Sequence, residues 1–432
     1  MEGANKQIKW SSLVKSEDWW AVWLGFLVMA LGIAGVVSKM PSVGGWTEIG
    51  KAISPSLMGG YGVVGLGVLL VTLPVVKGRG EGIKNYLLAF PFVFFLAFLA
   101  LFISKYDVIG KKWGLEYALW ALLLGLMISN TTGTPKWLKP AVRPELFIKF
   151  GLVLLGASIL FQQIMEVGPF ALLQTIFVIS AVFFFCYFLA RRLGLTKSLA
   201  TVMSSAVSIC GVSAAIASGG ASRAHPKEIS YTTSLVLLIA IPMLVLMPIV
   251  AKLLGFPDSI AGAWIGGVID TTPAVAAAGS VLGAGALKMA VIVKMAQNLF
   301  IGVAALLIAL YFALKAEANP AADKPGFREI WFRFPKFVLG FVLASLVFSL
   351  VLIPTIGLEA TNNIIKGVTE PLRGWLFALA FVSIGLETRV WDIVTMGRGK
   401  PFLVFVTAQA FNIFWTLAIA YIIFGDLLGR VT

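Results

Sequence analysis

Charged residues are scarce in this chain, at 12% of 432 positions, about half the share found in a soluble domain. There is one histidine, His225, and there are two cysteines, Cys186 and Cys210. A single histidine leaves a zinc peptidase without its HExxH ligands, and neither a Cys/His metal spacing nor a Walker-type phosphate loop nor a catalytic triad is present. We therefore expect no metal centre, no enzymatic activity and no disulfide.

Apolar residues are abundant instead, at 59% of the chain, and runs of about 20 of them recur along its whole length. A helix of that length crosses a hydrocarbon core of about 30 Å. The sequence therefore predicts an all-α polytopic membrane protein with about 13 transmembrane helices. The expected spans lie near 20–38, 57–76, 86–104, 115–130, 146–164, 170–190, 198–219, 231–254, 260–280, 286–314, 334–353, 371–386 and 401–424.

The formal net charge of +14 comes from basic residues that lie mainly between the apolar runs. That distribution does not form a nucleic-acid-binding face, so we expect no nucleic-acid partner. Cytoplasmic loops of membrane proteins hold the excess of Lys and Arg. When alternate loops are assigned to opposite sides, the larger share of basic residues falls on the side of the N-terminus. This pattern predicts a cytoplasmic N-terminus and a C-terminus on the outside.

Two Gly/Ser/Thr-rich interruptions, 204–213 and 266–273, lie inside these apolar runs. In hydrocarbon every backbone N–H and C=O needs a partner, so non-helical backbone survives only where it faces protein or a water-filled cavity. Interrupted helices at membrane depth are typical of transporter binding sites, because freed amides and carbonyls can hold small ions. We expect the two segments to approach each other and to line a cavity.

Asp270 lies in the second interruption, and an ionisable residue at membrane depth is a functional hypothesis by default. We expect a proton or Na⁺ site there, formed by Asp270 with the hydroxyls of Thr271 and Thr272. The alternative is that Asp270 only caps the helix half that starts at Thr271.

Lys294 stands in an otherwise apolar run, where it could attract an anion or neutralise Asp270. The alternative is a Lys whose stem snorkels to the interface. Serine hydroxyls and helix N-terminal amides of the first interruption could also bind an anion, although small residues commonly serve close helix packing. The expected substrate-binding residues are Ser204, Ser205, Ser208, Cys210, Gly211, Ser213, Lys294 and Asn298.

An internal similarity links two parts of the chain. Gly156 and Gly168 are spaced as Gly385 and Gly397 are, and an apolar run follows each pair. An odd number of spans separates the two copies, which predicts inverted-topology repeats with the two discontinuous helices at the centre. The domains expected are an N-terminal extension with about three transmembrane helices (1–113), a first core part with both interruptions (114–314), a polar linker (315–336) and a C-terminal core part (337–432).

Several motifs resemble the YeiH-type sulfate exporter family, and the most specific is Ser208-Ile209-Cys210-Gly211. The matching segments are 123–130, 151–156, 208–215, 265–270, 276–279, 293–295, 385–388 and 399–401. The resemblance covers roughly 115–424 and leaves the first three spans as an extension. It implies a fold similar to sodium/proton antiporters and bile-acid symporters, and a location in the cytoplasmic (inner) membrane of a bacterium.

The chain departs from that family at four positions. The family has His where this chain has Ile269, Gln where it has Pro273, and Arg where it has Ser158 and Gln297. The loss of two cationic positions weakens the inference that the substrate is a dianion such as sulfate. The fold therefore carries over better than the substrate.

The function expected is that of a secondary active transporter, of the anion or sulfate exporter type, coupled to H⁺ or Na⁺. One alternative is a cation/proton antiporter that uses Asp270 and Lys294 directly. Another is an intramembrane enzyme, for which only Cys210 or a serine with Asp270 is available. A receptor or scaffold would not explain two interrupted helices. The expected partners are a small anion, the lipid bilayer and, as a candidate assembly, a second copy of the chain; no cofactor is expected beyond Na⁺ as coupling ion.

Overall fold

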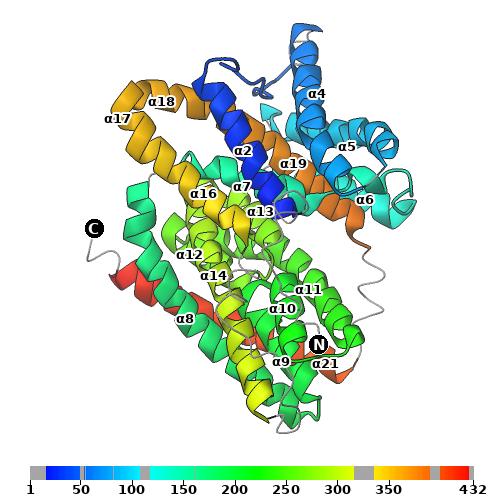
Figure 1. Ribbon diagram of the computed structural model, residues 1–432, viewed down its shortest axis with the longest axis vertical. Coiled ribbons are helices and arrows are strands. Elements are labelled where there is room, and N and C mark those ends of the chain that lie inside the picture. Colours follow the sequence, from blue (N-terminus) through cyan, green and yellow to red (C-terminus); the bar gives the residue numbers. More distant parts are fainter. Residues whose placement is uncertain are drawn as a thin grey trace, which may run out of the picture. The chain divides into compact units, whose positions relative to one another are not determined.

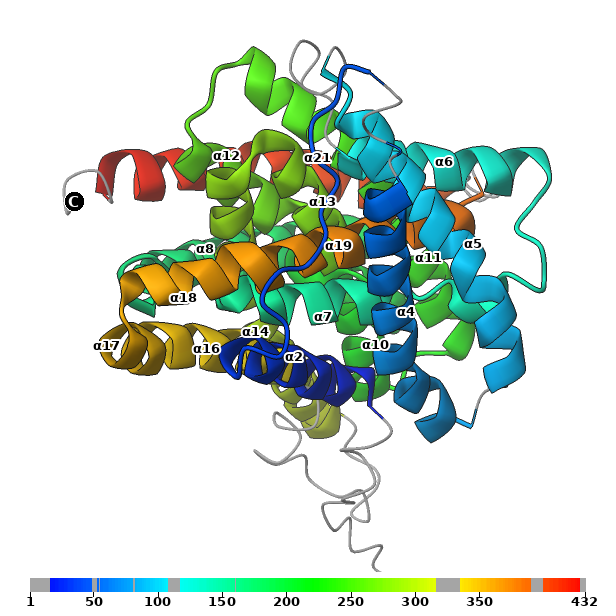
Figure 2. The same ribbon diagram turned by 90° about the horizontal axis from the view of Figure 1, so that it is seen from above.

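The structure is a computed structural model, and it describes residues 16–48, 53, 55–80, 82–107, 117–159, 161–315, 335–389 and 399–427. The regular elements in these ranges are all helices, with one isolated bridge between Trp46 and Tyr106. The all-α fold predicted from the sequence is confirmed. Figures 1 and 2 show the helices in two perpendicular views.

Seven helices within the described ranges are long and apolar enough to cross a membrane. They cover Leu57–Gly78, Ile83–Ser104, Ile164–Arg192, Lys227–Leu253, Ala284–Phe312, Lys336–Ile356 and Lys400–Gly425. Four shorter apolar helices accompany them, at Tyr117–Thr131, Lys197–Cys210, Val212–Ala221 and Thr272–Leu282. The chain is therefore a polytopic membrane protein, while the predicted number of crossings stays a prediction.

The chain divides into two compact units, each made of two sequence segments. Unit 1 comprises Met1–Gln162 and Lys336–Arg389, and unit 2 comprises Gln163–Pro335 and Val390–Thr432. The linear domain scheme expected from the sequence stays a prediction. Most of its polar linker, 316–334, and Gly397 of the internal similarity lie outside the described residues.

Unit 1 contains the N-terminal helices and those that precede the C-terminal segment. Their bounds are α2 (Glu17–Ile33), α4 (Pro55–Gly78), α5 (Ile83–Ser104), α6 (Tyr117–Thr131), η2 (Lys139–Ala141), α7 (Pro144–Gly156), α16 (Lys336–Leu346), η4 (Val347–Leu352), α17 (Ile353–Ile356), α18 (Leu358–Ile364), η5 (Ile365–Thr369) and α19 (Glu370–Glu387). Gly125 of α6 and Gly385 of α19 bring two backbones together, since a Cβ on either glycine would lie 2.8 Å from the other's Cα. The hydroxyl of Ser129 in α6 donates a hydrogen bond to the Gly385 carbonyl of α19 at 2.8 Å, which links the two helices at this crossing.

Unit 2 contains the two interrupted helices. Its elements are α8 (Phe161–Arg192), whose first residues belong to unit 1, α9 (Lys197–Ser205), η3 (Ala206–Cys210), α10 (Val212–Ala221), α11 (Pro226–Leu253), α12 (Asp258–Val268), α13 (Thr272–Leu282), α14 (Ala284–Lys315), α21 (Lys400–Ala420) and η6 (Tyr421–Leu427). Buried side chains of α8, α9, α11 and α21 form one core, with Val182, Met203, Leu235 and Phe405 among them.

Small residues let α12 pack closely on α14. A Cβ on Gly262 would lie 2.6 Å from the carbonyl oxygen of Ala286, and a Cβ on Gly266 would lie 2.5 Å from that of Ala290. Close backbone approach through small residues is the usual way in which membrane helices associate. It fixes the first half of the second interrupted helix against α14, the helix that carries Lys294.

Candidate functional site

The first interruption is a π-helical segment followed by one glycine. Helix α9 runs into η3, and the chain then turns at Gly211, with φ 57° and ψ −109°, before α10 begins at Val212. This positive φ is strained for any residue with a Cβ, and a Cβ at Gly211 would also lie 2.5 Å from Cγ1 of Val236. The predicted interruption within 204–213 is confirmed.

The second interruption lies between α12 and α13. Helix α12 ends at Val268, Ile269 is extended, and α13 starts at Thr272 with Pro273 in its first turn. The N-cap of α13 is Thr271, whose hydroxyl accepts from the backbone N–H of Ala274 at 3.3 Å. The predicted break within 266–273 is confirmed. The alternative in which Asp270 serves as the cap is wrong, because Thr271 has that place.

The two interruptions meet inside unit 2. A Cβ on Gly211 would lie 3.0 Å from the backbone oxygen of Asp270 and 3.2 Å from its Cβ. Asp270 is buried, with 2% of its surface exposed. The expected approach of the two segments is confirmed, and a cavity at their meeting point stays a prediction.

Backbone carbonyls freed in the first interruption are paired with side chains from distant helices. The Nζ of Lys294, on α14, donates to the carbonyl of Ile209 at 2.9 Å. The Nδ2 of Asn412, on α21, donates to the carbonyl of Val207 at 3.1 Å. These bonds supply the partners that backbone groups need in hydrocarbon.

Side chains of the same two helices, α14 and α21, also donate hydrogen bonds to the backbone carbonyls of the second interruption. The Nε2 of Gln297 donates to the carbonyl of Gly267 at 2.9 Å, and the Nε2 of Gln409 donates to that of Val268 at 3.0 Å. Lys294 also donates to Oε1 of Gln297 at 2.7 Å. This bond joins the side chains that hold the two interruptions.

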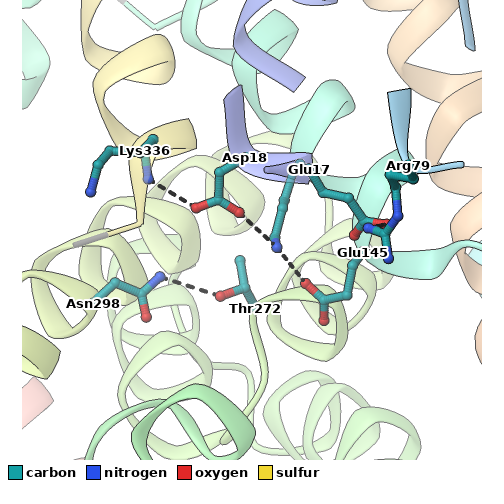
Figure 3. A network of polar contacts seen from close by, with 8 residues as sticks. Glu17, Asp18, Arg79, Glu145, Thr272, Asn298 and Lys336 are labelled. Atoms are coloured by element: carbon teal, nitrogen blue, oxygen red, sulfur yellow. Dashed lines mark hydrogen bonds and ion pairs between the residues drawn. The ribbon is translucent and has the colours of Figure 1, made fainter. Parts of the chain in front are cut away.

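Three buried acceptor atoms at this crossing have no hydrogen-bond donor among the described residues: Oδ2 of Asp270, Oδ1 of Asn298 and Oε1 of Gln409. Asn298 donates through its Nδ2 to the hydroxyl of Thr272 at 3.3 Å (Figure 3). Lys294 interacts electrostatically with Asp270, but no ion pair within 4.0 Å joins these two described residues. Oxygen acceptors without a hydrogen-bond donor can bind a proton or coordinate a hard cation such as Na⁺.

The serines expected to bind substrate have their protons engaged elsewhere. The hydroxyls of Ser204, Ser205 and Ser208 each donate to the carbonyl four residues earlier, at 2.7, 2.9 and 2.7 Å. Ser213 is exposed, whereas Cys210 is buried in the π segment. The predicted substrate role of these residues stays a prediction.

Three amide side chains that the sequence reasoning missed complete the site. Gln409 and Asn412 hold one carbonyl of each interruption, and Gln174 of α8 donates to the carbonyl of Ala263 at 2.8 Å. All three are polar residues in apolar runs, and that isolation is the signal that could have found them.

Comparison with known proteins places the chain among membrane proteins. The family model described as Conserved hypothetical protein 698 matches residues 88–404. No solved structure matches the chain.

Three relatives show the extent of the similarity, and each is named as a UPF0324 membrane protein. That of Rhodopirellula baltica is 44% identical over 369 residues, which cover 84% of this chain and 68% of the relative. One from Nitratidesulfovibrio vulgaris is 40% identical over 366 residues, 83% of this chain and 62% of the relative. That of Nitrosomonas europaea is 31% identical over 463 aligned positions, 90% of this chain and 92% of the relative. The chain thus spans about two thirds of the length of the first two.

Proposed function

The chain belongs to the Conserved hypothetical protein 698 family, the YeiH-type membrane proteins that its motifs indicate, and from this membership and its crossing we propose that it is a secondary active transporter. The substrate proposed is a small anion, moved across a bacterial inner membrane by alternating access. The coupling ion proposed is H⁺ or Na⁺.

The observation that carries this proposal is the contact between the two interruptions, Gly211 against Asp270. Each unsatisfied backbone group in lipid costs several kcal/mol. Because two helix breaks in contact are costly to maintain, their presence favours a functional role for this crossing. Each break also leaves a helix N-terminus at the crossing, that of α10 after Gly211 and that of α13 at Thr272. These partly positive ends favour an anion, while the unpartnered oxygens favour a cation. Together they suit coupled movement of the two.

The coupling role falls to Asp270. Its Oδ2 has no hydrogen-bond donor among the described residues, and Oδ1 of Asn298 is in the same condition. A proton on Asp270 would turn Oδ2 into a donor, and a Na⁺ ion would accept both oxygens as ligands. Either event removes the cost of an unpaired carboxylate at membrane depth.

A cation/proton antiporter is the second candidate, and the same observation favours it. The unpartnered atoms at the crossing are acceptors, which suit a cation. The ammonium of Lys294 already donates to the Ile209 carbonyl and to Gln297, so it is not free to bind an anion. In this function Asp270 and Lys294 would exchange a cation for a proton without any anion. An intramembrane enzyme that uses Ser204, Ser205 or Ser208 is disfavoured, because these hydroxyls donate to their own helix and not to a base.

Solid-supported membrane electrophysiology separates these candidates. Proteoliposomes receive concentration jumps of sulfate, sulfite, methanesulfonate or acetate, with either Na⁺ or K⁺ as cation and at two pH values. Currents evoked by an anion, absent from empty liposomes and dependent on Na⁺ or pH, support the proposal. Currents evoked by Na⁺ or pH jumps alone, with no response to any anion, would replace it with the antiporter.

A further inference from the structure

Helix α7 of unit 1 ends in a turn at residues 157–159. Helix α7 begins beside charged groups, where Lys149 pairs with Asp18 at 2.9 Å and with Glu145 at 3.2 Å. The helix ends at Gly156 after 13 residues, about 20 Å at 1.5 Å per residue, which is shorter than a hydrocarbon core of about 30 Å. A helix that starts at a polar surface and is this short ends inside the core.

Other helices of unit 1 supply the partners of this turn. Ser345 of α16 donates to the carbonyl of Ile159 at 2.5 Å, and the hydroxyl of Ser349 in η4 accepts from the backbone N–H of Phe161 at 2.8 Å. Ala157 and Ile159 are 3% and 1% exposed. The turn is therefore held by hydrogen bonds from other helices, as the interruptions of unit 2 are, and Ser158 in it is partly buried.

Arg373 reaches this turn from another helix. The segments α18, η5 and α19 continue one another, with right-handed helical backbone at each junction, and Arg373 stands near the middle of the combined helix. With 7, 5 and 18 residues this helix is about 45 Å long, more than the hydrocarbon core, and a helix of this length that crosses a membrane has its middle inside the core. The Nη1 of Arg373 donates to the hydroxyl of Ser158 at 3.1 Å.

The guanidinium of Arg373 has no carboxylate within 4.0 Å among the described residues. Its single hydrogen bond uses one of five N–H donors, and Ser158 in turn donates to the carbonyl of Leu155 at 2.8 Å. Two other cations of unit 1 do have carboxylate partners: Arg79 pairs with Glu17, and Lys149 pairs with Asp18 and Glu145. Tyr117 and Glu370 interact with Arg373 only through space, and Glu370 lies one turn earlier on the same helix.

We propose that Arg373, with the hydroxyl of Ser158, is an anion-binding site that takes a small oxyanion: a sulfate, sulfonate or carboxylate. This inference rests on the proposed function and names the group that binds its substrate. Four remaining N–H donors in a planar fork match two oxygens of such an anion, and charge-assisted bonds of this kind are the strong ones. A bound anion also removes the cost of an unpaired charge at membrane depth.

The test compares substitutions that separate the charge from the hydrogen bond. Arg373→Gln removes the charge, Arg373→Lys keeps it as a compact ammonium, and Ser158→Ala removes only the hydroxyl. The paired substitution Ser158→Arg with Arg373→Ser moves the guanidinium across the contact. Lys366→Gln, at an exposed position two turns earlier on the same helix, is the matched control.

Two readouts are measured for each variant: the half-saturating sulfate concentration of the transport current, and the rise in melting temperature that sodium sulfate gives over sodium chloride at equal ionic strength. We expect Arg373→Gln to raise the half-saturating concentration by about tenfold or more and to lose the sulfate-specific rise. Arg373→Lys should keep part of both, the paired substitution should regain them, and Lys366→Gln should match the wild type.

Wild-type values in Arg373→Gln would overturn the proposal and leave Arg373 as a structural tie to the turn. Should that variant fail to fold, Arg373→Lys decides, because unchanged affinity there contradicts bidentate binding. A wild-type protein that binds sulfate through Arg373 but carries no current would overturn the transport function alone. A wild type with neither response to sulfate, methanesulfonate or acetate would overturn both.

Discussion

Lys294 is hydrogen-bonded to the first interruption directly and to the second through Gln297. It is 1% exposed and its ammonium bonds to the carbonyl of Ile209 and to Gln297, which itself holds the carbonyl of Gly267. The alternative of a snorkelling side chain is wrong, since Nζ lies among buried groups of unit 2. Removal of this residue therefore affects backbone pairing as well as charge.

Lys294→Gln should abolish anion-dependent currents while the protein still folds, and Lys294→Arg should restore them in part. An unpaired Ile209 carbonyl would cost about 1–3 kcal/mol, which a stable transporter tolerates as a lowered melting temperature. Arginine is bulkier and not equivalent to an ammonium in a confined site. Lys252→Gln, at the exposed end of α11, is the control. Wild-type currents in Lys294→Gln would remove Lys294 from the transport mechanism.

Asp270→Asn tests the coupling role directly. If Asp270 carries a proton, the variant should transport without pH dependence; if it binds Na⁺, the variant should lose its Na⁺ requirement or all transport. Folding should be retained, because Thr271 is the cap of α13 and Oδ2 of Asp270 has no bond to lose. Currents are compared at several pH values with and without Na⁺, using the exposed Asp258→Asn as control. An unchanged rate, pH profile and ion dependence would exclude both coupling roles.

At the scale of elements, the two interruptions are built differently. The first combines a π-helical segment with one glycine of positive φ, whereas in the second Ile269 and the cap residue Thr271 are extended and Pro273 follows in the first turn of α13. Single π turns inside helices are frequent at functional sites. The first interruption requires a glycine at its turn, so a substitution of Gly211 tests whether this element needs its irregular backbone.

Gly211→Ala should destabilise the first interrupted helix by about 2–4 kcal/mol and reduce transport, because the added Cβ is strained at φ 57° and overlaps Val236. Gly59→Ala is the matched control: Gly59 lies in α4 with nothing within 4 Å of its added Cβ. Alanine there should stabilise the helix by about 0.5–1 kcal/mol. Melting temperatures in detergent are compared, and equal values for the two variants would contradict the strain.

At the scale of the whole molecule, the basic residues predict the orientation. We expect a cytoplasmic N-terminus and an external C-terminus. Alkaline phosphatase fused to the C-terminus should therefore be active and a fluorescent protein that folds only in the cytoplasm should be dark, with the reverse pattern for fusions to the loop near Arg192. Bright cytoplasmic reporters at both the C-terminus and the loop near Arg192 would mean an even number of crossings between them, in place of the seven predicted.

Sequence alone determined the membrane class and the places where helices break. Apolar runs of about 20 residues have one stable solution in lipid, the helix, so their composition carries the fold class. Gly211, Asp270 and Pro273 predict the helix breaks, because the backbone preferences of these residues act locally. One predicted span is shorter than the observed helix: the span expected at 371–386 continues back to Leu358 in the structure. The polar residues of 359–370 hide that extension from a hydropathy criterion.

Only the tertiary structure decided which side chains complete the sites. Lys294 meets Ile209 across 85 positions, Asn412 meets Val207 across 205, and Arg373 meets Ser158 across 215. No local pattern encodes such pairs, because each donor sits in an apolar helix whose register and packing fix where it points. The sequence therefore marks where backbone groups lose their partners, and the packing of distant helices determines which residues replace them.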